Sequence, residues 1–468
     1  MIPLSSDSPY PATSRTVALI VTTMASFLTP FMGSAANVAL PAVGREFSMN
    51  ALALNWVATS FLLASAMSLV PLGRIADLYG RKRIFLWGIV LYTASSLACS
   101  LAPDAALLIF SRFLQGIGGA MIFGTATAIL ISVFPATERG KVLGINVAAV
   151  YTGLSAGPLI GGLLTQHFGW RSIYLFNAAL GLVVLFCTLW KLRDEWAEAR
   201  GERFDLTGSI IYSLSLLFLM VGVSRLPAPE AGFSVVTGIA GIVAFIKWEM
   251  ETPSPLLDIS LFRKNRAFTF SNLAALINYS ATYAVSFLVS LYLQFIKDFP
   301  PQHAGMILLA QPVIQAFFSP LIGRLSDRIE PRLLASLGMA LTACGLYVLI
   351  FINASSSLAY ILASLVLLGL GFALFSSPNV NAIMSSVDRK FLGLASGTLA
   401  TMRILGQMFS MGIAMLIFAL VIGKVQITPV YYPLLLKSMK LAFSILTVLC
   451  FLGIFASLAR GRMRKDQA

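Results

Sequence analysis

The chain has 468 residues, of which 58% are hydrophobic and only 11% are charged. Soluble globular domains carry about 25% charged residues, so this composition leaves too little polar surface for water and excludes a soluble protein. The net charge of +14 would suggest a nucleic-acid partner in a soluble chain, but here the basic residues stand in short gaps between apolar runs, which argues against nucleic acid.

Runs without charged residues predict membrane-spanning helices. They cover residues 16–44, 47–73, 84–103, 113–137, 142–170, 172–190, 206–224, 231–246, 267–296, 304–323 and 333–387, and two more runs follow, around Arg403 and at 441–459. The run 333–387 is broken by "NASSS" at 353–357, so it holds two helices. A span needs roughly 20 apolar residues. We therefore predict an all-α integral membrane protein with fourteen transmembrane helices. The first helix lacks the pattern of a removable signal peptide and is expected to be retained.

Lysine and arginine gather at one end of these helices. They occur as "RKR" at 81–83, Arg139 and Lys141, the segment 191–203, "RKNR" at 263–266, Arg324, Arg328 and Arg332, Arg389 and Lys390, and the tail "RGRMRK". Cytoplasmic loops carry such an excess, so we predict that both termini are cytoplasmic. The pattern indicates a multi-pass protein of a prokaryotic plasma (inner) membrane.

An internal repeat divides the chain. "GRIADLYGRKR" begins at Gly73 and "GRLSDRIEPR" begins at Gly323, 250 residues later, and "ERGKVLG" at 138–144 is echoed by "DRKFLG" at 388–393. Such a parallel repeat relates the two halves of major facilitator transporters. We therefore expect an N-terminal six-helix bundle at 1–192, a linker with two extra transmembrane helices at 193–262, and a C-terminal six-helix bundle at 263–468.

The first copy, "GRIADLYGRKR", closely resembles the loop between the second and third helices of the major facilitator superfamily. Its glycines permit close packing and a tight turn, and its aspartate can cap a helix N-terminus or pair with a loop arginine. We interpret it as a conformational latch between the two bundles. The latch residues are Gly73, Asp77, Gly80, Arg81 and Lys82, with Asp327 in the second copy. A solvated charged loop is the alternative, but it explains only the arginines.

Two further strings resemble signatures of the same superfamily. "LIFSRFLQGIGGA" at 108–120 is similar to its fourth-helix motif and places Arg112 and Gln115 on one helix face. Arg112 is expected to face the bundle interior, or else to lie near the outer end and extend toward the membrane surface. "GLSAGPLIGG" resembles the fifth-helix signature of its antiporter branch. Its glycines form a stripe for close helix approach, and its proline kinks the helix; the signature residues are Gly153, Gly157, Pro158, Gly161 and Gly162.

The resemblance extends over nearly the whole chain. "GWRSIYLFN" at 169–177, "FDLTG" at 204–208, "PLLDISLFR" at 255–263, "LYLQ" at 291–294 and "GLASGTLATMRILGQ" at 393–407 look like parts of the fourteen-helix drug/proton antiporter family of multidrug exporters. The resemblance implies export of small, often lipophilic compounds by alternating access around a site near the membrane midplane.

The chain departs from that family in its first helix. "NVALP" is present at 37–41, but Met32 stands where the family usually has aspartate. None of the nineteen acidic residues falls at the predicted midplane; they lie in loops, at the cytoplasmic edge or near the termini. The expected cavity residues are Met32, Asn37, Arg112, Gln115, Asn278, Tyr279, Tyr283, Gln311, Gln315, Asn379, Arg403 and Gln407. Such a cavity should favour neutral or anionic ligands, unless helix carbonyls cap both arginines and these only set the packing.

The leading hypothesis is a secondary active exporter of small amphiphilic compounds, acting by antiport with protons as the coupling ion. An alternative is an exporter or uniporter of anionic, lipid-like or metabolite substrates that lacks the usual carboxylate coupling. A membrane receptor or scaffold that kept the fold but lost transport is a further alternative. We expect no enzyme activity, cofactor or metal, because the sequence shows no nucleophile–base pair, phosphate loop or metal-ligand spacing. The expected partners are the lipid bilayer and a small-molecule substrate, with the protein as a monomer.

Overall fold

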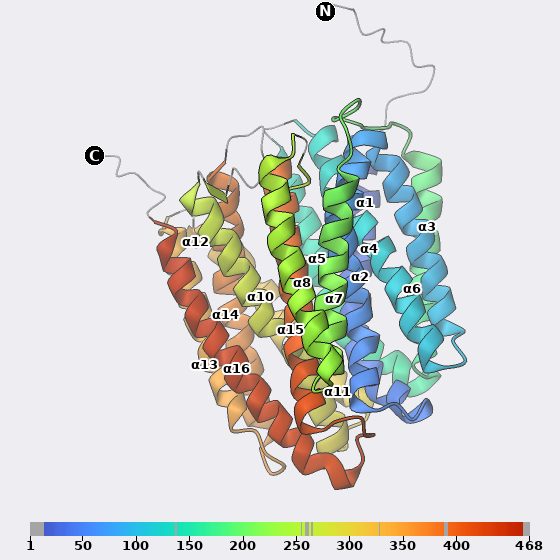
Figure 1. Ribbon diagram of the computed structural model, residues 1–468, viewed down its shortest axis with the longest axis vertical. Coiled ribbons are helices and arrows are strands. Elements are labelled where there is room, and N and C mark those ends of the chain that lie inside the picture. Colours follow the sequence, from blue (N-terminus) through green and yellow to red (C-terminus); the bar gives the residue numbers. More distant parts are fainter. Residues whose placement is uncertain are drawn as a thin grey trace, which may run out of the picture.

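The computed structural model describes residues 14–135, 138–253, 255–257, 262–263, 265–326, 328–387 and 392–461, without the side chains of residues 140, 141 and 392. Within these residues the fold is helical, with one isolated β-bridge between Asn50 and Gln426. Fourteen segments of the described chain are long and apolar enough to cross a membrane. The structure thus confirms the all-α membrane fold and the fourteen predicted spans (Figure 1).

The first eight helices are α1 (Arg15–Glu46), α2 (Ala51–Tyr79), α3 (Arg81–Ser100), α4 (Ala105–Val133), α5 (Arg139–Phe168), α6 (Arg171–Lys191), α7 (Leu206–Arg225) and α8 (Pro229–Glu251). The chain continues with α10 (Arg266–Leu291), the short π-helix η1 (Tyr292–Ile296), α11 (Pro301–Leu308), α12 (Ala310–Ser326), α13 (Pro331–Ile350), α14 (Leu358–Ser385), α15 (Leu392–Val421), the 3₁₀-helix η3 (Pro429–Tyr431) and α16 (Tyr432–Ala459). The tenth span is thus made of two helices, α11 and α12, that meet at Leu309.

Polar side chains mark several helix starts. Asn50, Asp104, Asp205, Asn265 and Ser357 each accept a hydrogen bond from a backbone N–H in the first turn of the helix that follows. Such caps satisfy donors that a helix leaves free at its N-terminus. Each long, continuous apolar run between the caps satisfies its backbone hydrogen bonds in lipid within the segment by forming a helix.

The helices run up and down through one bundle, and the start of α1 and the end of α16 lie at the same end of it (Figure 1). We call this the terminal end and the opposite one the far end. Helix α1 packs on α5, α3 on α4, and α13 on α14. Helices α7 and α8, coloured green in Figure 1, pack on each other, and α7 also contacts α2 and α15.

The helices α1–α6 meet the helices α10–α16 in direct contact at the far end. The Ser290 hydroxyl donates to the Asn37 carbonyl at 2.8 Å, and the Gln294 amide nitrogen donates to the Val38 carbonyl at 2.8 Å. The backbone N–H of Ala51 donates to the Val425 carbonyl at 3.0 Å. These three hydrogen bonds hold the two sets of helices together at the far end.

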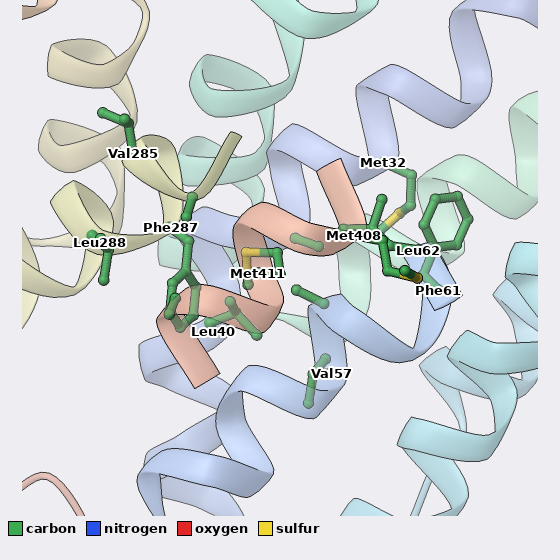
Figure 2. Close-up of a cluster of buried hydrophobic side chains, with 14 of the residues drawn as sticks. Met32, Leu40, Val57, Phe61, Leu62, Val285, Phe287, Leu288, Met408 and Met411 are labelled. Atoms are coloured by element: carbon green, nitrogen blue, oxygen red, sulfur yellow. The ribbon is translucent and has the colours of Figure 1, made fainter. Parts of the chain in front are cut away.

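A methionine-rich apolar cluster fills the space between α1, α2, α10 and α15 (Figure 2). Met32, Leu40, Val57, Phe287 and Met411 are among its members, and each is at most 1% exposed. Methionine side chains fill irregular gaps between helices because they are unbranched and flexible. The cluster seals the space between the two sets of helices on the side of the far end.

Candidate functional site

A cavity of about 160 Å³ lies between the two sets of helices. Its walls come from α1, α2, α4 and α5 on one side and from α10, α11, α12, α14 and α15 on the other. Part of the apolar cluster lies about one helical turn further toward the far end, since Leu40 follows the lining residue Asn37 and Met411 follows the lining residue Gln407. Its member Met32 lies level with the cavity, between the lining residues Pro30 and Gly33. The cavity is therefore central, and both halves of the repeat contribute to it.

Helix α1 lines the cavity with the polar and small residues of its middle section. Pro30, Gly33, Ser34 and Asn37 all face it, together with Thr29. The Ser34 hydroxyl donates to the Pro30 carbonyl at 2.9 Å, one turn earlier in the same helix, so the side chain is satisfied within α1. The sequence "LTPFMGSAANVALP" is thus a cavity wall.

Helix α5 holds α1 in this place through its glycine stripe. A Cβ on Gly153 would meet the Phe27 carbonyl oxygen at 2.6 Å, and one on Gly161 would meet the Ala35 Cα at 2.8 Å. On the other face of α5, a Cβ on Gly162 would meet the Pro301 carbonyl oxygen of α11 at 2.6 Å. Only glycine allows these backbone approaches. The signature therefore packs α1 on one side and a helix of the opposite set on the other.

Arg403 is the charged residue that lines the cavity. Its guanidinium carbon lies 5.5 Å from the ring centre of Tyr279 and 5.6 Å from that of Phe123. No acidic residue lines the described cavity, and Arg403 forms no ion pair with a described carboxylate. The field at the site is therefore positive and not neutralised by a neighbouring acid.

Aromatic rings and amides contribute ten of the other lining residues. The rings are those of Phe61, Phe123, Tyr151, Tyr279, Tyr283 and Phe372, and the amides are those of Asn37, Gln311, Gln315 and Gln407. The Tyr279 and Phe372 rings meet edge to face with centres 5.4 Å apart. Across the two sets, the Tyr151 and Ser376 hydroxyls share a hydrogen bond. Such walls suit flat, partly polar molecules, because rings supply stacking surface and amides supply both donors and acceptors.

Arg112 does not line the cavity. It is 1% exposed, donates from Nε to the Val57 carbonyl at 3.0 Å and hydrogen-bonds Gln115. Gln115 in turn donates to the Ser96 hydroxyl at 2.7 Å. The guanidinium lies 4.7 Å from the ring centre of Phe61, a cavity residue, so Arg112 sits one layer behind the wall. Of the two arginines, this one matches the alternative in which a helix carbonyl caps the charge and the residue sets the packing.

The twelve expected cavity residues divide into those that line the cavity and those that lie behind its wall. Asn37, Tyr279, Tyr283, Gln311, Gln315, Arg403 and Gln407 line the cavity, whereas Met32, Arg112, Gln115, Asn278 and Asn379 are buried beside it. Met32 faces the apolar cluster beside Leu62 and Met408 (Figure 2). The sequence does not indicate that the rings of Phe61, Phe123, Tyr151 and Phe372 line the cavity, because an aromatic residue in a membrane helix gives no sign of the face on which it lies.

The predicted latch loop has a partner that the sequence did not indicate. Arg81 donates to the Asp77 carboxylate at 2.8 Å and, in a fork, to both oxygens of Glu198 at 2.7 and 3.1 Å. Glu195 accepts from the backbone N–H groups of Lys82 and Arg83 at 2.8 and 3.2 Å, so it caps the N-terminus of α3. We call the segment 193–204, which brings in these glutamates, the strap.

The partners of Glu198 on α3 and α4 also set its charge state. Burial raises the pKa of Glu198, but the Arg81 guanidinium and the hydrogen bonds from Ser132 and Arg81 outweigh it, so the pKa lies below its ordinary value. The carboxylate is therefore ionised at neutral pH and holds Arg81 as a charged pair.

The glycines of the loop differ from each other. Gly80 has φ of +123°, and a Cβ there would collide with the Glu195 carboxyl carbon at 2.5 Å. A Cβ on Gly73 would meet nothing within 4 Å, so close packing does not explain that residue.

The other latch residues are Lys82 and Asp327. Lys82 donates from Nζ to the Arg193 carbonyl at 3.0 Å. Asp327, the predicted latch residue of the second copy, lies outside the described residues.

No group of three or more histidine, cysteine or acidic side chains in the described parts of the chain could hold a metal ion. The site thus offers a cavity, one cation, rings and amides.

Comparisons with known proteins agree with this architecture. The family model of the Major Facilitator Superfamily matches residues 22–300 and again residues 271–467. The riboflavin transporter RibZ of Clostridioides difficile is 29% identical over 401 residues, which cover 85% of this chain and 86% of the relative. The multidrug resistance protein Stp of Mycobacterium tuberculosis is 33% identical over 401 residues, covering 84% of this chain and 74% of the relative.

A solved structure shows the same fold at low sequence identity. The crystal structure of a peptide transporter POT in complex with sulfate superposes with a TM-score of 0.70 at 13% identity, covering 94% of each chain. Together, the matched sequence and the matched fold extend over most of the molecule.

Proposed function

The chain belongs to the major facilitator superfamily, in a drug exporter-like family of membrane transporters, and from this premise we propose that it exports small amphiphilic compounds. It is a transporter and not an enzyme.

The central cavity is the observation that supports this proposal most directly. It is built from both halves of the repeat, six aromatic rings line it, and its one cation, Arg403, has no acidic counterpart in the lining. Rings and amides together accept molecules that are apolar over most of their surface and polar at a few points. We propose that neutral and anionic amphiphiles bind here and that lipophilic cations bind weakly.

Export would proceed by alternating access between two moving bodies, 1–192 and 263–468, with 193–262 as the insert between them. The far end is closed by the contacts of Ser290, Gln294 and Ala51 described above. The charge pattern supports a cytoplasmic terminal end. On this assignment the structure is closed toward the outside, in the state from which an exporter takes up its substrate in the cell membrane of a prokaryote.

A thermal-shift series on the purified chain tests the ligand class. Matched cationic, neutral and anionic amphiphiles of similar size are added, and the unfolding temperature is measured. We expect stabilisation by neutral and anionic members, since ligands that bind the folded state raise its stability. Stabilisation by the cations alone would contradict the proposed cavity.

A second candidate is transport of an anionic or metabolite-like substrate without proton coupling. Two observations favour it: Met32 fills the usual carboxylate position, and the relative named as a riboflavin transporter handles a flat, polar heteroaromatic compound. Uptake into proteoliposomes separates the two. Dissipating an imposed pH gradient abolishes accumulation by an antiporter and leaves the downhill flux of a uniporter unchanged.

A further inference from the structure

Two buried carboxyl groups meet where α7 and α8 reach the terminal end of the bundle. Asp205 precedes α7 and is 8% exposed, and Glu249 lies in the last turn of α8 and is 3% exposed. A Cβ on Gly208 would lie 2.9 Å from the carboxyl carbon of Asp205 and 2.9 Å from Oε1 of Glu249. Both carboxyl groups therefore converge on one point beside a glycine.

The two carboxyl groups differ in their hydrogen-bond partners. Asp205 accepts from the Gly208 backbone at 2.8 Å and from the Trp248 indole at 2.9 Å. Glu249 accepts from the Leu257 backbone through Oε2 at 2.8 Å, while its buried Oε1 has no hydrogen-bond partner among the described residues. The donors around Asp205 stabilise a negative charge, whereas Oε1 of Glu249 has none.

No cation among the described residues offsets these two acids. The charged residues on the adjoining segments are Arg203, Lys247, Glu251 and Arg263, all exposed, with Arg74 on α2 and Arg403 on α15. Arg74 is bound by Glu202 at 2.6 Å, and Arg403 lies at the cavity. None of them forms an ion pair with Asp205 or Glu249. Two buried like charges without a counter-ion cannot both stay ionised.

We propose that Asp205 and Glu249 form a proton-binding site, which holds one proton between them at neutral pH. The proton is carried by Oε1 of Glu249 and donated to the Asp205 carboxylate. This arrangement gives the one unpartnered oxygen a partner and keeps the negative charge where the Gly208 and Trp248 donors point. The site lies outside the substrate cavity, in the pair of helices inserted between the two bundles.

The site is joined to the loop described above. Asp205 directly follows the strap, whose Glu198 and Glu202 hold Arg81 and Arg74 at the ends of α3 and α2. Loss of the shared proton would place two charges at the base of the strap. Use of this proton in transport rests on the proposed function, whereas proton binding itself does not.

Infrared spectroscopy on the purified full-length chain tests the proton directly. A carboxylic acid absorbs at a C=O frequency distinct from that of a carboxylate. We expect an acid band at neutral pH in the wild type, its loss in Glu249→Gln and its retention in Glu251→Gln, an exposed acid on the same helix. An unchanged band in Glu249→Gln would overturn the proposal.

The wild type alone supplies a second readout. The acid band should disappear as the pH is raised, and the unfolding temperature should fall over the same pH range, because the second charge is then buried without a partner. In Glu249→Gln, which carries a neutral group of the same shape, the unfolding temperature should not fall in that range. Absence of an acid band from the wild type at neutral pH overturns the proposal whether or not the variant folds, and leaves the proposed export function untouched.

Discussion

At the scale of single residues, the two membrane-embedded arginines have opposite surroundings. Arg112 is held by the Val57 carbonyl and by Gln115 behind the ring of Phe61, whereas Arg403 faces the cavity among Tyr279 and Phe123. A buried cation is stable where hydrogen-bond acceptors surround it, and it is available to a ligand where they do not. We therefore expect a change at Arg403 to affect ligand binding and a change at Arg112 to affect stability.

We predict that Arg403→Gln weakens binding of an anionic amphiphile about tenfold, which corresponds to ~1.4 kcal/mol. The reason is loss of the cavity's one cation, while the amide keeps a polar group in its place. Binding is measured by titration calorimetry or tryptophan fluorescence.

Arg324→Gln, an exposed change on α12, is the matched control and should leave affinity unchanged. If Arg403→Gln bound the anionic amphiphile as tightly as the wild type, the positive charge of Arg403 would have no role in anion binding.

Arg112→Gln should instead lower the unfolding temperature, since it removes a donor from the buried Val57 carbonyl.

At the scale of elements, α5 decides where α1 lies. Its stripe brings the two helices into contact along Gly153, Gly157 and Gly161, and the neighbouring Gly162 meets α11. The strap is the second such element, because it binds the loop between α2 and α3 through side chains from a segment more than a hundred residues later.

Gly157→Ala should destabilise the protein. A Cβ there would collide with the Phe31 carbonyl oxygen at 2.7 Å and with Ser34, so α1 must move away from α5. Overpacking of this kind costs typically about 1–3 kcal/mol, which thermal or denaturant unfolding detects.

The same helix offers the control. At Gly144 a Cβ would meet nothing within 4 Å, and alanine is the better helix former by roughly 0.5–1 kcal/mol, so Gly144→Ala should be neutral or stabilising. Similar losses in both variants would mean that the stripe does not set the α1–α5 distance.

The strap should loosen in acid. The pKa of Glu198 is lowered in the folded protein, so its contribution is fully present above its ordinary value of 4.5 and is lost as the pH falls through the lower folded value. Hydrogen exchange of the peptide 193–204, corrected for the intrinsic pH dependence, should therefore speed up as the pH falls through the lowered pKa of Glu198.

Glu198→Gln mimics the protonated carboxyl and should show the faster exchange already at neutral pH. Glu230→Gln, in the first turn of α8, is the control and should not. If the hydrogen-exchange protection of this peptide in Glu198→Gln equalled that of the wild type, the ion pair with Arg81 would not be what holds the strap in place.

At the scale of the whole molecule, the two sets of helices are joined at the far end and enclose the cavity. Nε2 of His167 on α5 and Oε1 of Gln302 on α11 lie 3.3 Å apart across this junction; His167 is exposed and Gln302 is partly buried. Alternating access requires such contacts to break once in each cycle.

We predict that the double variant His167→Cys/Gln302→Cys, cross-linked by a short bis-methanethiosulfonate reagent, stops transport into proteoliposomes and recovers it on reduction. The cross-link would fix the far end closed. Arg15→Cys/Glu138→Cys is the matched control, because the charged atoms of this pair lie 3.6 Å apart within the first set of helices and at the terminal end. Its cross-linking should leave transport intact, and undiminished flux through the far-end cross-link would contradict a moving junction.

The number and kind of the helices follow from the sequence alone. An apolar run in lipid must satisfy its own backbone, so each run becomes a helix wherever it lies in the fold. The motifs around Gly73, Arg112 and Gly153 likewise identify the family without any coordinates. About half of the expected cavity residues also lie in the wall, because they are polar residues on helices that face the other half.

The tertiary structure decided which face each side chain occupies and which distant residue it meets. Composition could not place Met32 in an apolar cluster, Arg112 behind Phe61, or Glu198 on Arg81, since each depends on how neighbouring helices are rotated and on contacts far apart in the chain. Nor could it show Asp205 and Glu249 as buried partners, because two acids near helix ends are ordinarily solvated. In lipid, local sequence is enough to make a helix, but only packing determines which of its polar groups lose water and thereby acquire a function.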